Sequence, residues 1–128
     1  MSIFALRKIE AVKGKQQFYE LLVDGVSNYK QFSDSIKDNS QYCSEMRTIL
    51  AYMNFVAELK MLPKTKFRDI TPAKDNVKEY EFKSDHLRVY AFHIEKTGKV
   101  VALWGFKNNQ DEDIKKFRSI KKRFIETL

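Results

Sequence analysis

The stretch 77–107 contains the side chains of this chain whose types are best suited to chemistry. Arg88, Lys83 and Lys107 are cations, and arginine binds phosphate best because its rigid fork offers two parallel donors that stay charged. The same stretch holds a carboxylate, Glu81, and two imidazoles, which titrate near neutral pH. Such a set is suited to binding an anion and to moving protons. The imidazoles are His86 and His93.

The pattern of this stretch predicts three adjacent strands at the centre of a sheet. Aromatic and charged residues alternate over 80–83, as in a strand with one buried face. Residues 87–94 are rich in β-branched and aromatic types, and 95–99 predicts a hairpin loop in which Gly98 takes a positive φ. The apolar run 100–106 is typical of a strand that is covered on both faces, so we expect it to be central.

The strand 87–94 poses a conflict between core and site. On a regular strand, Arg88 and Tyr90 would point to the same face of the sheet as Phe92 and Ile94. Either one of these pairs bends away, or the face that they share is divided between the core and a site. A core position for Tyr90 and a hydrogen-bonded structural role for His93 are the alternatives to functional roles.

Two further strands and a helix are predicted before this stretch. Residues 3–11 and 17–23 read as an antiparallel pair joined by an exposed turn at 12–16. A short amphipathic helix follows, with Ser27 or Asp24 near its start.

The longest helical signal runs from 40 to 62 and ends at Pro63. Its apolar stripe fits packing on a sheet, and a surface that binds a partner or lines a ligand site would look the same. The stripe contains Tyr42, Met46, Ile49, Leu50, Met53, Val56, Ala57 and Met61. Residues off the stripe include Glu45, Arg47, Asn54, Glu58 and Lys60.

A loop at 64–74 and a helix at 111–128 complete the expected elements. Acidic residues lead that helix and basic residues follow, which is the order that the helix dipole favours. Its expected packing face contains Ile114, Phe117, Ile120 or Lys121, Phe124 and Leu128.

Length and charge bound the class of protein. A chain of 128 residues is long enough for one core, so we expect a single domain, 1–128. The 24 Lys and Arg exceed the 17 Asp and Glu, and the net charge of +7 favours an anionic partner: nucleic acid, an anionic membrane surface or an acidic protein.

The single cysteine, Cys43, excludes an intramolecular disulfide and leaves no cysteine-based zinc cluster. With neither a secretory signal nor a membrane span in the sequence, we expect a cytoplasmic protein without a membrane partner.

Three motifs in the central stretch occur in a fixed order, and together they resemble a known family. They are Tyr80-Glu81-Phe82-Lys83, then Arg88-Val89-Tyr90-Ala91-Phe92, then Val100-Val101-Ala102-Leu103-Trp104-Gly105-Phe106-Lys107. This order is similar to the HigB-like branch of the RelE/ParE toxin superfamily. Outside these motifs the resemblance extends only to the order of elements, with helices before the sheet and a helix after it.

The resemblance implies a compact α+β, RelE-like domain. We expect a twisted, mainly antiparallel sheet with an N-terminal hairpin, two helices packed on the sheet and a C-terminal helix. The implied function is that of a type II toxin, a ribosome-dependent endoribonuclease that cuts mRNA and is silenced by a cognate antitoxin, either an acidic or a helix-turn-helix protein. RNA supplies its own nucleophile, the 2′-hydroxyl, so such an enzyme needs no metal and no small-molecule cofactor.

The resemblance also implies roles for single residues. Arg88 matches the family's arginine and would clamp the phosphate, with Lys83 and Lys107 beside it. Glu81 is a candidate general base, and His86 or His93 a candidate acid or base. Tyr90 is a candidate for stacking on a nucleobase.

Basic residues outside the central strands are candidates for further RNA contacts, the alternative being an ordinary solvated surface. They are Lys66, Arg68, Lys115 and Lys122.

The chain also departs from the family pattern. Lys83 stands where the family has arginine, Asn108 and Asn109 replace a second basic residue, and neither histidine nor tyrosine follows Gln110. These departures leave a second function open, a non-catalytic RelE-fold module that binds nucleic acid or protein. A third, an inhibitor of a nucleic-acid enzyme such as gyrase, is supported by fold alone.

Overall fold

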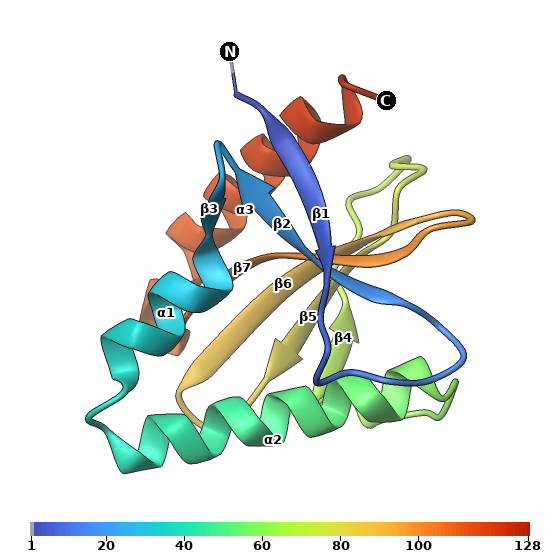
Figure 1. Cartoon of the computed structure of the whole chain (residues 1–128). Coiled ribbons are helices and arrows are strands. Elements are labelled where there is room, and N and C mark those ends of the chain that lie inside the picture. The colour runs from blue at the N-terminus through green and yellow to red at the C-terminus, as the bar shows by residue number, and fades with distance from the viewer. Residues whose placement is uncertain (1) are drawn as a thin grey trace.

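The structure, a computed structural model, describes residues 2–128. Its elements, in chain order, are β1 Phe4–Lys8, β2 Phe18–Val23, β3 Val26–Ser27, α1 Asn28–Ile36, α2 Ser40–Ala57, β4 Phe67–Asp69, β5 Glu79–Lys83, β6 Leu87–Ile94, β7 Gly98–Phe106, the 3₁₀ turn η1 Lys107–Asn109 and α3 Gln110–Ile125. The strands form one sheet in the order β1-β2-β7-β6-β5-β4, and the short β3 pairs with β2 (Figure 1). Neighbouring strands are antiparallel except β2 and β7, which are parallel. The predicted α+β fold, with its N-terminal hairpin, mainly antiparallel sheet and C-terminal helix, is confirmed.

Helices cover both faces of the sheet (Figure 1). On one face, apolar residues of α1 and α2 such as Phe32, Ile49 and Met53 pack on the sheet. On the other face, Phe117, Ile120 and Phe124 of α3 pack against the sheet. Because β6 and β7 lie between these two layers, both strands are buried over most of their length, as the apolar run 100–106 predicts.

Local signals explain several element boundaries. Ser27 caps α1 by accepting a hydrogen bond from the backbone N–H of Lys30 at 3.0 Å. Asp24 and Gly25 both have positive φ, which suits the tight turn between β2 and β3. In the β6–β7 hairpin Gly98 has a φ of +135°, and an added Cβ would lie 2.3 Å from the carbonyl oxygen of Gln17. Only glycine is therefore compatible with this turn.

The predicted helix 40–62 is too long, because α2 ends at Ala57. The chain turns at Leu59, which has a φ of +63°, several residues before Pro63. The expectation that Met61 packs in the core is therefore wrong, since its side chain is 92% exposed. Glu45, expected off the packing stripe, is buried.

The predicted loop 64–74 contains a short strand, β4. Arg68 pairs with Glu81 in the register between β4 and β5. Phe67 lies against the rings of Tyr80 and Phe82, with centroids 5.0 and 4.6 Å apart. Tertiary contacts rather than local propensity thus form this strand.

Candidate functional site

The basic residues predicted to form a site meet at one end of the sheet. Lys83 pairs with Arg88 across β5 and β6, and Arg88 pairs with Gly105 across β6 and β7. The backbone N–H of Lys107 donates to the carbonyl of His86 at 2.7 Å. The β5–β6 turn and the end of β7 therefore bring the backbones of Lys83, Arg88 and Lys107 together.

The guanidinium of Arg88 is turned into this end of the sheet. The residue is only 8% exposed, and its Nη1 donates to the carbonyl oxygens of Ser84 and Leu87 at 2.5 and 2.8 Å. Its Nε is buried without a hydrogen-bond partner in the described part of the chain. In this conformation Arg88 braces the β5–β6 turn and does not present an exposed fork to a phosphate.

Glu81 is completely buried between two donors. Its carboxylate lies 3.0 Å from Nη2 of Arg68 and also accepts a hydrogen bond from the side chain of Gln110, the first residue of α3. As placed, Glu81 is out of reach of a substrate in solvent. Arg68, predicted to contact RNA, is held in this ion pair with its side chain 43% exposed.

Tyr90 occupies the core position that the sequence left as its alternative role. It is fully buried, and its ring lies 5.7 Å from that of Phe117 in α3. Burial, together with the negative charge of Glu81, raises the pKa of Tyr90 above its ordinary value. Stacking of Tyr90 on a base, which stays a prediction, would require α3 to move.

A buried carboxylate that sequence reasoning did not select holds the imidazole of His86. Oε1 of Glu45 accepts hydrogen bonds from the Ser84 hydroxyl and the His86 backbone N–H, at 2.5 and 2.7 Å. Its other oxygen, Oε2, lies 2.6 Å from Nδ1 of His86 and accepts from Gln41 at 3.0 Å. Burial alone would raise the pKa of Glu45, but the hydrogen bonds from Ser84, Gln41 and His86 together lower it to about 2.

The charge on Glu45 fixes the tautomer of His86. Because Glu45 is ionised at neutral pH, Nδ1 of His86 must carry the hydrogen that this carboxylate accepts. In the neutral imidazole, Nε2 is then a free acceptor. The side chain of His86 is 54% exposed, so Nε2 is available for proton transfer.

A hollow of about 350 Å³ lies beside His86. It is lined by Tyr42, His86, Phe106, Lys107 and Asn108. Tyr42 packs against both His86 and Phe106, with ring centroids 5.7 and 5.2 Å apart. The hollow thus combines a cation, an oriented imidazole and aromatic walls, groups that suit an unpaired nucleotide.

His93 lies at the opposite end of β6 from His86. It pairs with Lys99, and its Nδ1 is buried without a hydrogen-bond partner among residues 2–128. Burial, followed by the positive charge of Lys99, lowers the pKa of His93. Of the two histidines that the sequence left open, His86 is therefore the one that the fold brings to the basic end of the sheet.

The remaining predicted RNA contacts lie elsewhere. Lys66 precedes β4, with its Nζ 5.5 Å from the centroid of the Tyr52 ring. Lys115 and Lys122 are exposed on α3, and Lys122 borders a different cleft. These lysines are not gathered with His86.

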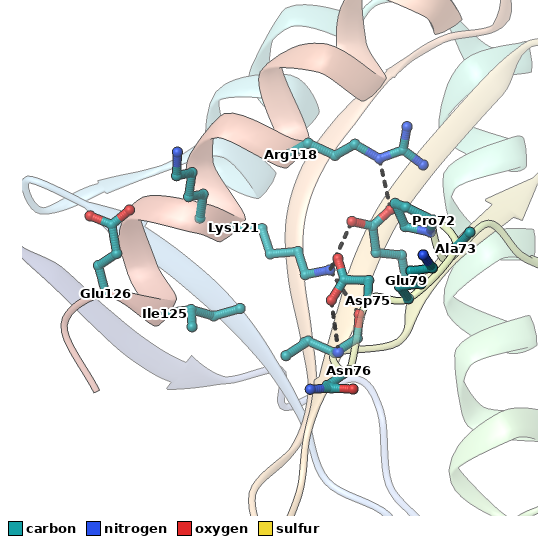
Figure 2. A pocket seen from close by; sticks show the side chains of 12 residues that line it. Pro72, Ala73, Asp75, Asn76, Glu79, Arg118, Lys121, Ile125 and Glu126 are labelled. Atoms are coloured by element: carbon teal, nitrogen blue, oxygen red, sulfur yellow. Dashed lines mark hydrogen bonds and ion pairs between the residues drawn. The ribbon is translucent and has the colours of Figure 1, made fainter.

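That second cleft, about 660 Å³ in volume, lies between α3 and the loop before β5 (Figure 2). Nζ of Lys121, a buried residue, lies 2.9 Å from Asp75, 2.8 Å from Glu79 and 2.8 Å from the carbonyl of Val77. Arg118 also pairs with Glu79, at 3.0 Å. Since the cations of Lys121 and partly exposed Arg118 offset the charges of buried Glu79 and partly exposed Asp75, the network is explained by its role in fastening α3 to the sheet.

Comparisons with known protein families, curated proteins and solved structures find no match to this chain. Among residues 2–128 there is no group of three or more His, Cys, Asp or Glu side chains placed to hold a metal ion. None of the helices in that range is both long and apolar enough to cross a bilayer.

Proposed function

We propose that this chain is the toxin of a type II toxin–antitoxin system and cleaves mRNA without a metal, with His86 as its proton-transfer residue. The observation that carries the proposal is the contact between Glu45 and His86 beside the hollow that Lys107 lines. The resemblance of the three strand motifs to the HigB-like branch and the net charge of +7 support it as well.

The proposed reaction uses the nucleophile of the substrate. The RNA 2′-hydroxyl attacks the adjacent phosphorus, and Nε2 of His86 removes the hydroxyl proton. The bond to the 5′-oxygen breaks, the leaving oxygen takes up a proton from a water molecule, and His86 later returns its own proton to solvent. The products are a 2′,3′-cyclic phosphate and a 5′-hydroxyl. Lys107, together with Lys83 at the end of β5, would offset the charge that builds up on the phosphoryl oxygens. Glu45 would hold the imidazole in the tautomer that accepts the proton.

The proposed partners follow from charge and resemblance. The substrate would be mRNA on the ribosome, and a cognate antitoxin, acidic or with a helix-turn-helix, would keep the basic toxin silent in the resting cell. A protein of net charge +7 attracts both kinds of partner electrostatically. We propose the cytoplasm as the place of action, because both partners are found there.

The second candidate function is a non-catalytic RelE-fold module that binds nucleic acid or protein. Burial of the Arg88 guanidinium and of the Glu81 carboxylate favours this alternative, because both residues belong to the catalytic set that the family resemblance implies. Such a module would bind RNA with an affinity that falls steeply as salt rises, without cutting it.

Expression of the chain alone tests the proposal. We expect growth arrest and translation-dependent cleavage of transcripts, and His86→Ala should slow cleavage by roughly 10² to 10⁴-fold. His93→Ala is the matched control, since it removes the same side chain from the other end of β6 and should leave cleavage within about twofold. A folded protein that causes neither arrest nor cleavage, yet binds RNA in a salt-sensitive way, would replace the toxin by the non-catalytic module.

A further inference from the structure

The C-terminal end of α2 exposes apolar side chains that the fold does not use. Phe55 is 44% exposed, Leu59 64% and Met61 92%. These three make up half of the strongly exposed large apolar residues in the part of the chain that the structure describes, and they lie within seven positions. Clustered exposed apolar residues mark interaction sites more often than scattered ones.

The backbone of Leu59 adopts a left-handed conformation that is unfavourable for leucine. The N–H of Leu59 donates to the carbonyl of Val56, and the N–H of Lys60 donates to that of Phe55, which together form a Schellman turn. The residue at this position takes a left-handed conformation, here a φ of +63°, that glycine adopts freely and leucine only at a cost of about 1 kcal/mol. The chain thus has a large exposed side chain at a position where the stability of the fold alone would favour glycine.

Lysines lie near the end of α2 together with these apolar side chains. Nζ of Lys60 lies 5.1 Å from the centroid of the Phe55 ring. The loop before β2 runs to the C-terminal end of α2 (Figure 1). It is held there by hydrogen bonds from the N–H of Lys13 to Asn54 at 2.8 Å and from the N–H of Gln16 to the carbonyl of Ala57 at 2.9 Å. Lys13 and Lys15 of this loop are exposed. We refer to this region as the α2-end surface: Lys13, Lys15, Phe55, Leu59, Lys60 and Met61.

We propose that the α2-end surface is a docking site for an acidic helical segment of another protein, in which apolar side chains recur at every third or fourth position among carboxylates. Charge complementarity selects this partner, because Lys13, Lys15 and Lys60 outnumber the exposed carboxylates nearest to them in the chain, Glu10 and Glu58, and attract an acidic segment. A second copy of this chain would bring the same lysines face to face and be repelled. An anionic bilayer would also attract these lysines, but only three apolar side chains are exposed here for insertion, and the vesicles in the test below distinguish the two partners.

The proposed docking site is separate from the proposed catalytic site. Glu45 and Phe55 are both on α2, and ten residues of helix place them about 15 Å apart. The docking proposal therefore does not depend on ribonuclease activity, and binding and cleavage are measured independently.

The test measures binding of the full chain to a labelled synthetic helical peptide with leucine at every third or fourth position and glutamate elsewhere. We expect salt-sensitive binding that Leu59→Gly weakens by about tenfold or more, since the peptide then loses an apolar contact. The same substitution should leave the thermal midpoint of unfolding unchanged or raise it, because glycine fits the left-handed turn. If Leu59→Gly loses peptide binding without losing stability, Leu59 acts in docking and not in folding.

Two controls complete the design. Leu128→Ser removes another strongly exposed leucine, 75% exposed at the end of the chain, and should leave binding unchanged. A peptide of equal charge with serine in place of leucine should bind at least about tenfold more weakly. The proposal is overturned if the leucine peptide does not bind, if Leu59→Gly binds it as well as the wild type, or if phosphatidylglycerol vesicles bind and the peptide does not.

Discussion

Nδ1 of His86 lies 2.6 Å from Oε2 of Glu45, although the two residues are 41 positions apart in the chain. One belongs to the turn between β5 and β6, and the other to the second turn of α2. The orientation of the imidazole therefore depends on how α2 packs on the sheet. A change that shifts this helix should alter the site without touching His86 itself.

Glu45 should make the stability of the protein sensitive to acid. A folded-state pKa of about 2 against an ordinary value of 4.5 means that the ionised carboxylate stabilises the fold above pH 4.5, by about 3 kcal/mol. This stabilisation is lost as the pH falls from 4.5 towards 2. Glu45→Gln should lower the free energy of unfolding at pH 7, and the gap to the wild type should narrow in acid. Urea unfolding at pH 7 and at a pH near 3 checks this, with Glu58→Gln as the control, since Glu58 is exposed at the C-cap of the same helix.

Gly105 should be sensitive to the smallest added side chain. A Cβ there would lie 2.1 Å from Oδ2 of Asp113, which packs over the end of β7. Gly105→Ala should destabilise the protein by about 1–3 kcal/mol, and the same change should be close to neutral once Asp113→Ala has removed the clash. A double-mutant cycle by chemical unfolding measures the coupling. Additive effects would show that Asp113 is not the obstacle.

Lys121 and Lys122 are neighbours on α3 with opposite expected effects. Lys121→Met leaves the buried carboxylate of Glu79 with Arg118 as its remaining cationic partner, and should destabilise the protein by about 3–5 kcal/mol. Lys122→Met changes an exposed residue and should stay within about 0.5 kcal/mol. Equal effects in guanidinium unfolding would contradict the role assigned to the network in Figure 2.

Lys99 should be a residue whose charge opposes folding. Burial lowers its pKa from 10.5 to about 8, so the folded state binds fewer protons than the unfolded chain between these values and stability rises with pH across that window. At pH 7 Lys99→Met should stabilise the protein by up to about 3 kcal/mol, less what is lost with the bond to Gln16 and the contact with the Tyr80 ring. The gain should shrink at pH 9.5. Lys96 is exposed in the same hairpin, so Lys96→Met should leave the free energy of unfolding unchanged at both pH 7 and pH 9.5.

Much of the fold could be predicted from periodicity because each element buries a continuous face. The run 100–106 is apolar at nearly every position, and β7 is covered by helices on both sides. The end of α2 could not be predicted, because a leucine in a left-handed conformation leaves no mark in the sequence and Pro63 offered a plausible end. Strand β4 is only three residues long and depends on its contacts with β5.

The candidate site was predicted in part. Strand order was enough to place Lys83, Arg88 and Lys107 at one end of the sheet. Strand order did not predict the direction of the Arg88 side chain, because its guanidinium turns inward to donate to carbonyls of its own turn. The partner of His86 was hidden because Glu45 is distant in sequence and looks like an ordinary exposed residue on a helix. A polar turn containing histidine, next to the basic strand ends, was the signal that could have favoured His86 over His93.

The parallel pairing of β2 with β7 joins strands from the two ends of the chain. During synthesis the first hairpin leaves the ribosome long before its sheet neighbour exists, and α1 and α2 emerge before most of the strands that they cover. The sheet therefore cannot be completed before β7 has been translated. If the protein does cut messages on ribosomes, this topology delays the activity of a nascent chain until β7 can pair with β2.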